Sequence, residues 1–131
     1  MIYLDTTTRK LQAVLAGAHA TTAPKIVVFF YDGPAQTKDD NSEYHGSTQV
    51  ATTNGSTDVD ICAAPSFIGT TRNIPSIMVH NIDTASITLT IKIDDATVEA
   101  PLWKGTLATL ECLSYEHGLG WQATTAAGAR K

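Results

Sequence analysis

The segment 86–93, SITLTIKI, alternates apolar and polar residues without a break. An apolar residue occupies every second position from Ile87 to Ile93, with threonine or lysine between them. Successive side chains of a strand point to opposite faces, whereas the residues on one face of a helix recur every 3.6 positions. The period of two therefore predicts a strand with one buried face and one solvated face.

Segments of similar character recur along most of the chain, separated by turn residues, at spacings of roughly 8–12 residues. This spacing is typical of an all-β sandwich or barrel. We predict a single antiparallel β-sandwich, of jelly-roll type, with eight or nine short strands. The expected strands are 10–16, 25–31, 47–53, 57–63, 73–80, 86–93, 97–103, 106–115 and 121–125.

Turn residues predict where several of these strands begin and end. Asn54-Gly55 lies between two strand-like runs and predicts a hairpin that joins them. Pro75 has no N–H to donate, so its strand is expected to start near Ser76 or to lie at an edge. Gly105 is expected to end one strand before the next begins.

Two segments differ from the alternating pattern. The run 25–31, KIVVFFY, is nearly continuously apolar, which is typical of a strand buried on both faces. The segment 4–16 has a helical alternative, because Leu11, Val14 and Leu15 are spaced as on one face of a helix. It lacks a capping box, and we favour the strand.

The length and the charge limit what the chain can be. Its 131 residues fit one domain, residues 1–131, with 1–9 as a possible N-terminal arm. The net charge of −4 argues against nucleic acid as a partner, because duplex-binding modules carry basic patches. Only 17% of the residues are charged, and threonine is the most frequent residue. Small soluble domains usually carry more surface charge, so we expect part of this surface to be covered by protein.

The sequence contains no compartment signal. The N-terminal residues lack the basic and apolar regions of a secretory signal, and the longest apolar run, 26–31, is far shorter than the ~20 residues that cross a bilayer. We therefore expect synthesis in the cytoplasm and no membrane partner. Cys62 and Cys112 are expected to be reduced thiols, with a disulfide as the alternative.

The loop 32–46 partly resembles a calcium-binding loop. Asp39, Asn41 and Glu43 alternate as oxygen ligands would. Tyr44 then stands where a sharp turn needs glycine, and Val50 stands where a bidentate glutamate is needed. A solvated surface loop is the favoured interpretation, and weak cation binding remains open.

Patterns for catalysis are missing from the sequence. None of the four histidines has another histidine at zinc-ligand spacing, and His80, Glu111 and His117 would supply only part of a cupin-like metal site. No G-x-S-x-G elbow is present, and neither cysteine has a basic neighbour in sequence that would lower its pKa. We predict no enzyme activity, no cofactor and no metal.

Several runs in the chain occur in a distinctive order. They comprise a strand that ends in Asn-x-Asp, a Thr-rich strand, and a Gly-x-Gly-Trp hairpin near the C-terminus. This order resembles small β-sandwich virion proteins of tailed bacteriophages, whose members include capsid decoration (cement) proteins and neck or tail accessory proteins. The residues that carry the resemblance are LDTTT at 4–8, ICAAP at 61–65, RNI at 72–74, IMVHNID at 77–83, SITLTI at 86–91, LATL at 107–110, LSY at 113–115, GLGW at 118–121 and Gly128.

Two short apolar segments are candidate contacts with a partner. Ile2, Tyr3 and Leu4 precede a polar segment and form a candidate arm, with a frayed end or a first edge strand as the alternative. Phe67 and Ile68 lie in a loop that also contains proline and glycine, where the alternative is burial under the sandwich.

The resemblance implies a non-enzymatic structural protein on the capsid surface of a virion. Such a protein would bind across major capsid protein subunits and stabilise the head, as a homodimer or homotrimer. A neck, tail or fibre accessory protein is the nearest alternative. A carbohydrate-binding or receptor-binding sandwich is another, in which Trp103, Tyr115 and Trp121 would be stacking platforms instead of core residues.

Overall fold

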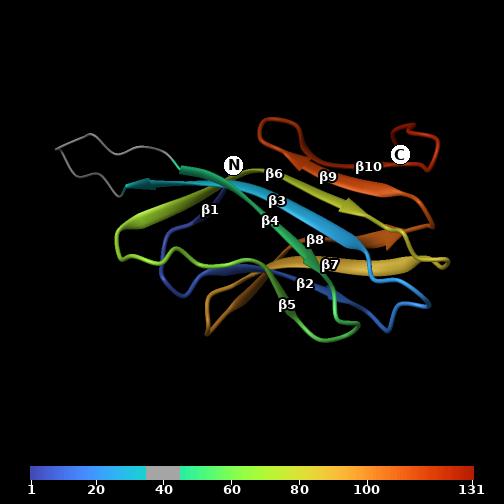
Figure 1. The fold of residues 1–131 in the computed structure, drawn as a ribbon, viewed down its shortest axis with the longest axis horizontal. Coiled ribbons are helices and arrows are strands. Elements are labelled where there is room, and N and C mark those ends of the chain that lie inside the picture. The colour runs from blue at the N-terminus through green and yellow to red at the C-terminus, as the bar shows by residue number, and fades with distance from the viewer. Residues whose placement is uncertain (35–44) are drawn as a thin grey trace.

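The computed structural model describes residues 1–34 and 45–131, which form ten strands and no helix (Figure 1). The segment 4–16 therefore holds a strand and not the alternative helix. The strands are β1 (Ile2–Leu4), β2 (Lys10–Leu15), β3 (Lys25–Pro34), β4 (His45–Thr52), β5 (Val59–Cys62), β6 (Thr70–His80), β7 (Ile87–Asp94), β8 (Glu99–Leu107), β9 (Cys112–Glu116) and β10 (Gly120–Thr124).

The strands form two antiparallel sheets that pack against each other, which confirms an all-β sandwich. The six-stranded sheet has the order β10-β9-β6-β3-β4, and β1 also pairs with β6. The four-stranded sheet has the order β5-β2-β7-β8. Figure 1 shows the β9–β10 hairpin at one side of the molecule and the N-terminus beside β6.

The core lies between the inner faces of the two sheets. The alternation predicted for 86–93 is present over 87–91, where Ile87, Leu89 and Ile91 are buried while the threonines between them are only half-buried. It ends at a register shift after Ile91, where Lys92 is buried and Ile93 is half-buried. The largest fully buried side chains come from both sheets: Leu4, Leu11, Ile26, Val28, Ile61, Ile74, Ile77, Val79, Leu89, Ile91, Leu107 and Leu113.

The first residues of the chain form a strand of the sandwich and not an arm. β1 pairs with β6, with Ile2 opposite Ile74 and Leu4 opposite Arg72. Ile2 and Leu4 are both buried, because their side chains face the core, as the side chain of Ile74 does. This strand raises the number of strands to ten, above the eight or nine expected.

Pro75 lies inside β6, so the expected start near Ser76 is wrong. The missing N–H of Pro75 is tolerated because β6 changes partners there: Ile74 pairs with β1 and Ser76 pairs with β9. On the opposite edge of β6, the pairing with β3 shifts register between Phe29 and Tyr31. The pairing of β6 is therefore irregular on both edges at Pro75, and a sheet can accept a proline at such a position.

Asn54-Gly55 makes the expected turn but not the expected hairpin. Thr57 donates its backbone N–H to the Asn54 carbonyl at 3.1 Å, and Gly55 has φ +56°. The flanking strands nevertheless belong to different sheets, because β4 pairs with β3 and β5 pairs with β2. The turn therefore carries the chain from one layer to the other.

β8 continues through Gly105 and ends at Leu107, so the predicted strand 106–115 is wrong in its first half, whereas residues 112–115 belong to β9 as expected. A turn separates β8 from β9, with Leu110 at φ +63°. Glu111 donates its backbone N–H to the Ala108 carbonyl at 3.1 Å. The turn contains neither glycine nor proline, so no residue of the sequence marks it as a turn.

Candidate interaction surfaces

Phe67 and Ile68 form an exposed apolar tip on the loop between β5 and β6, here named the 67–68 tip. Thr70 donates its backbone N–H to the Phe67 carbonyl at 3.2 Å, and Gly69 has φ +85°, as in a type II turn. The two side chains are 76% and 95% exposed, so the alternative of burial under the sandwich is excluded.

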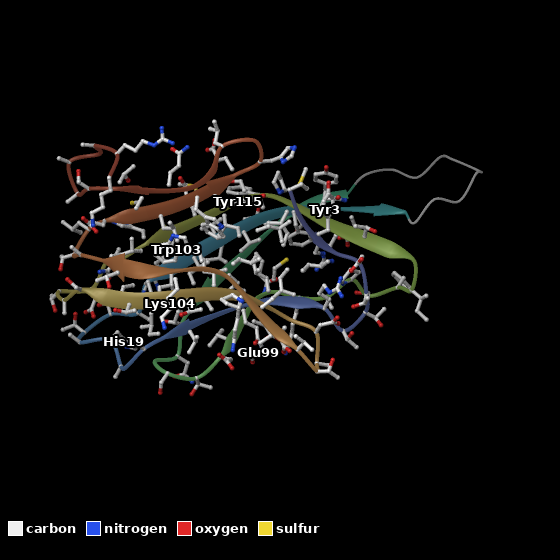
Figure 2. The ribbon with its side chains drawn as sticks, turned by 180° about the vertical axis from the view of Figure 1, so that it is seen from behind. Tyr3, His19, Glu99, Trp103, Lys104 and Tyr115 are labelled. Atoms are coloured by element: carbon white, nitrogen blue, oxygen red, sulfur yellow. The ribbon has the colours of Figure 1, made fainter. Side chains whose placement is uncertain are left out.

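The other three contact candidates divide between the core and the surface. Ile2 and Leu4 are buried, so in this fold they are unable to contact a partner. Tyr3 is 53% exposed and is labelled in Figure 2. It lies with Arg9 and Val98 around a depression of about 250 Å³. Only Tyr3 remains available for contact at this end.

The outer face of the four-stranded sheet carries charges that pair with one another. Lys92 on β7 contacts Asp58 and Glu99, each at 2.8 Å, and is itself buried. Lys10 on β2 contacts Asp60 at 3.0 Å. These ion pairs link neighbouring strands, and their charged groups make this face polar, as is usual for a solvent-exposed surface. Figure 2 shows Glu99 and Lys104 on the β8 side of this sheet.

The outer face of the six-stranded sheet is poor in charge and partly apolar. Val27 on β3 lies opposite Val50 of β4 on one side and Met78 of β6 on the other. Met78 is 53% exposed and borders a groove of about 470 Å³. The outward side chains of this face, in β4, β3, β6, β9 and β10 order, are Thr48, Val50, Thr52, Lys25, Val27, Phe29, Ser76, Met78, His80, Cys112, Ser114, Glu116, Gln122 and Thr124.

The prediction that 25–31 is buried on both faces is therefore wrong for this chain on its own. Ile26 and Val28 are fully buried between the sheets, but Val27 is only half-buried and Phe29 is exposed. Within the described residues, no further layer packs on this side of the sheet. The sequence did contain a signal for this surface, because the apolar run 25–31 includes Val27 and Phe29, which face outward.

Asn81 and Asp83 organise one end of the sandwich. The buried Asn81 amide donates to the carbonyls of Ala85, Leu107 and Ala108, each at 3.0 Å. Asp83 lies in the β6–β7 connection and accepts hydrogen bonds from the β2–β3 loop. Burial raises the pKa of Asp83, but the backbone N–H groups of residues 20–22 and the Thr21 hydroxyl more than offset it and hold this pKa well below its usual value.

Arg72 is a buried cation, and each of its three side-chain nitrogens donates a hydrogen bond. Its Nε and a terminal nitrogen each donate to an Asp32 carboxylate oxygen at 2.7 Å, and its other terminal nitrogen donates to the Ala63 carbonyl at 2.8 Å. The guanidinium lies 4.1 Å from the centre of the Phe30 ring. Burial raises the pKa of the neighbouring Cys62 thiol to about 11, so this thiol is protonated at neutral pH.

The residues considered for a metal site are not brought together. His80 lies opposite Cys112 at one end of β9, whereas His117 follows the other end and lies 2.7 Å from the N-terminal amine. Glu111 accepts hydrogen bonds from the Ala108 N–H and from the Lys131 ammonium. Residues 1–34 and 45–131 contain no group of three potential metal ligands, and the loop residues Asp39, Asn41 and Glu43 lie outside the described residues.

Both cysteines are free, as expected, with Cys62 buried and Cys112 half-buried.

The aromatic residues considered as stacking platforms instead pack on one another. Trp103 of β8 lies 6.2 Å from Trp121 of β10, and Tyr115 of β9 lies 5.0 Å from Trp121, measured between ring centres (Figure 2). They join the β8 edge of one sheet to the β9–β10 edge of the other.

Comparison of the chain with protein-family models, with curated proteins and with solved structures gave no match. Among the residues that the structure describes, no helix is long and apolar enough to span a membrane.

Proposed function

We propose that this chain is a non-enzymatic structural protein of a tailed-phage particle, and specifically a capsid decoration (cement) protein on the virion surface. The single observation that supports it best is the 67–68 tip, because two adjacent apolar side chains exposed on a turn suit a contact with another protein. In this proposal the tip inserts between subunits of the major capsid protein. The jelly-roll path of the strands, which was predicted from their spacing, stays a prediction.

The tip is small, and repetition compensates for its size. Burial of one phenylalanine or isoleucine side chain contributes about 1.5–3 kcal/mol. An oligomer that presents several tips to a lattice would bind through effective concentration. The same tip on a neck, tail or fibre protein would act at far fewer copies. The packing of Trp103 and Trp121 against the core gives no support to the carbohydrate-binding alternative.

Copy number distinguishes these roles. Quantitative mass spectrometry of purified particles is expected to find this chain in hundreds of copies per particle. Six or twelve copies would assign it to the neck or tail, and particles without it would reject a virion role.

A pair of variants tests the tip itself. The double variant Phe67→Ser/Ile68→Ser is expected to lose at least tenfold in affinity for particles stripped of this protein, measured by co-sedimentation. Leu110→Ser/Leu119→Ser is the control, because it removes two exposed apolar side chains from other turns. Both proteins should keep the parent's thermal unfolding midpoint. Equal binding by the tip variant and the parent contradicts the proposal.

A further inference from the structure

We propose that the outer face of the six-stranded sheet is the interface with a second copy of this chain, in a symmetric dimer. This inference does not depend on the proposed phage role, and concerns a surface that excludes the 67–68 tip. Three observations carry it: the apolar run of β3, the placement of two charges, and the contrast with the opposite face of the molecule.

The β3 residues have the composition of a strand that is covered on both sides. Val27 and Phe29 face outward from this strand, and Val50 and Met78 extend their apolar surface onto the strands on either side. A strand with a solvated face normally alternates apolar with polar residues, as β7 does. A second protein layer over this face would bury β3 on both sides, which is the environment typical of a nearly continuous apolar strand.

The two full charges on this face are placed for pairing between copies. Lys25 lies opposite His80, and Glu116 lies opposite Ser76, so the two charges are diagonally across Met78, which lies midway between His80 and Ser76 on β6. Both charged side chains are exposed, and within the described residues neither has an ion-pair partner. A cation and an anion on opposite sides of one point make a face complementary to itself.

The register fixes how two such faces would meet. A two-fold axis in the plane of the interface, passing over Met78 at right angles to the line from Lys25 to Glu116, places each lysine over the glutamate of the other copy. The same axis runs between Phe29 and Val50, so the apolar part of the face meets its own counterpart. Charge pairing and apolar contact are thus satisfied by one arrangement.

The second sheet provides the contrast. Lys10 and Lys92 of this sheet already pair with acidic side chains of the same chain. None of the large apolar side chains exposed in the described residues lies on its strands. The strand spacing and residue repeat give the proposed interface on the order of 500 Å² per copy. The total of about 1,000 Å² is at the lower limit for specific association, so we expect a weak dimer with a dissociation constant in the micromolar range.

Charge reversal tests the proposal. Sedimentation equilibrium between about 1 and about 500 µM is expected to show a monomer–dimer equilibrium for the parent. Lys25→Glu and Glu116→Lys should each weaken the dimer at least tenfold, because each puts like charges opposite one another. The double variant K25E/E116K restores opposite charges and should recover the parent's affinity to within about threefold.

Two more variants complete the design. Lys104→Glu makes the same charge change on β8 and should leave the dimer unchanged. Met78→Lys places two like charges at the axis and should give a monomer with the parent's unfolding midpoint. A parent that stays monomeric over the whole range overturns the proposal. So do single reversals that dimerise like the parent, or a double variant that is not rescued, since a different partner or geometry would then cover this face.

Discussion

At the scale of single residues, the absence of a side chain at Gly105 decides how one side of the sandwich closes. The Trp103 ring packs directly over this glycine, and an added Cβ would lie 2.7 Å from a ring carbon. From this position the Trp103 ring also packs against Trp121 of the other sheet, at 6.2 Å between ring centres. The glycine was expected to end a strand, but its actual role is to make room for an aromatic ring.

Gly105→Ala is therefore expected to destabilise the protein by about 1–3 kcal/mol, because the Trp103 ring must shift away from its contacts. Urea denaturation followed by tryptophan fluorescence measures the change. Gly17→Ala is the control, since nothing lies within 4 Å of the added atom. An unchanged urea midpoint for Gly105→Ala would contradict the packing described.

Asp83 gives the protein a specific dependence on pH. Because its pKa is lowered in the folded state, its ionised form contributes stability above the unfolded pKa of about 4, and this contribution is lost as the pH falls below that value. Asp83→Asn should lower the free energy of unfolding at pH 7 and flatten its decline in acid. Part of the decline in acid should remain in this variant, because the pKa values of Asp95 and Glu111 are also lowered in the folded state. Parallel curves for both proteins between pH 7 and 3 would argue against this role.

At the scale of elements, β6 is the strand on which the six-stranded sheet depends. It pairs along one edge with β3 and along the other with β1 and then β9. The short strand β1 is thus a structural element, although three residues make few backbone hydrogen bonds. Most of its contribution comes from burial of Ile2 and Leu4.

Leu4→Ala tests whether β1 belongs to the folded unit. Leu4 is fully buried, so its truncation should cost about 2–5 kcal/mol in the free energy of unfolding, measured by chemical denaturation. Tyr3→Ala, at the exposed position beside it, should cost much less. If both substitutions had the same small effect, these residues would behave as a free arm.

The elements that the sequence predicted well are those with a local cause. Alternation placed β7, and glycine placed the β9–β10 turn, where Gly118 has φ +90°. The errors had tertiary causes. The position of Pro75 in β6 depends on where two other strands end, and the turn before β9 is held by the Asn81 carbonyl, which accepts the Leu110 N–H at 2.8 Å.

The candidate surfaces were predictable to a similar degree. The exposure of Phe67 and Ile68 follows from a turn with glycine at its third position, which a sequence can indicate. The fate of Ile2 and Leu4 depended on an unforeseen partner strand. The diagonal placement of Lys25 and Glu116 required the register of three strands, which no pattern in one chain supplies.

At the scale of the whole molecule, the low charge of the sequence is distributed unevenly. The four-stranded sheet and its turns hold most of the described ion pairs, including those of Lys10 and Lys92. The six-stranded sheet presents threonine, serine and apolar groups instead. The charged residues, 17% of the sequence, are thus common on the outer face of the four-stranded sheet and sparse on that of the six-stranded sheet. This is the pattern of a protein with one permanently solvated side.

The split edge of β6 also bears on how the chain is made. Synthesis delivers β1, β3 and β6 long before β9, so on the ribosome the second half of β6 has an unpaired edge until residues 112–116 emerge. Unpaired strand edges are templates for aggregation, and sandwiches dominated by distant pairings fold in milliseconds to seconds. A stop codon or a proteolytic cut before residue 112 would leave that edge permanently open. β9 therefore covers this edge and protects the completed chain from pairing with its neighbours.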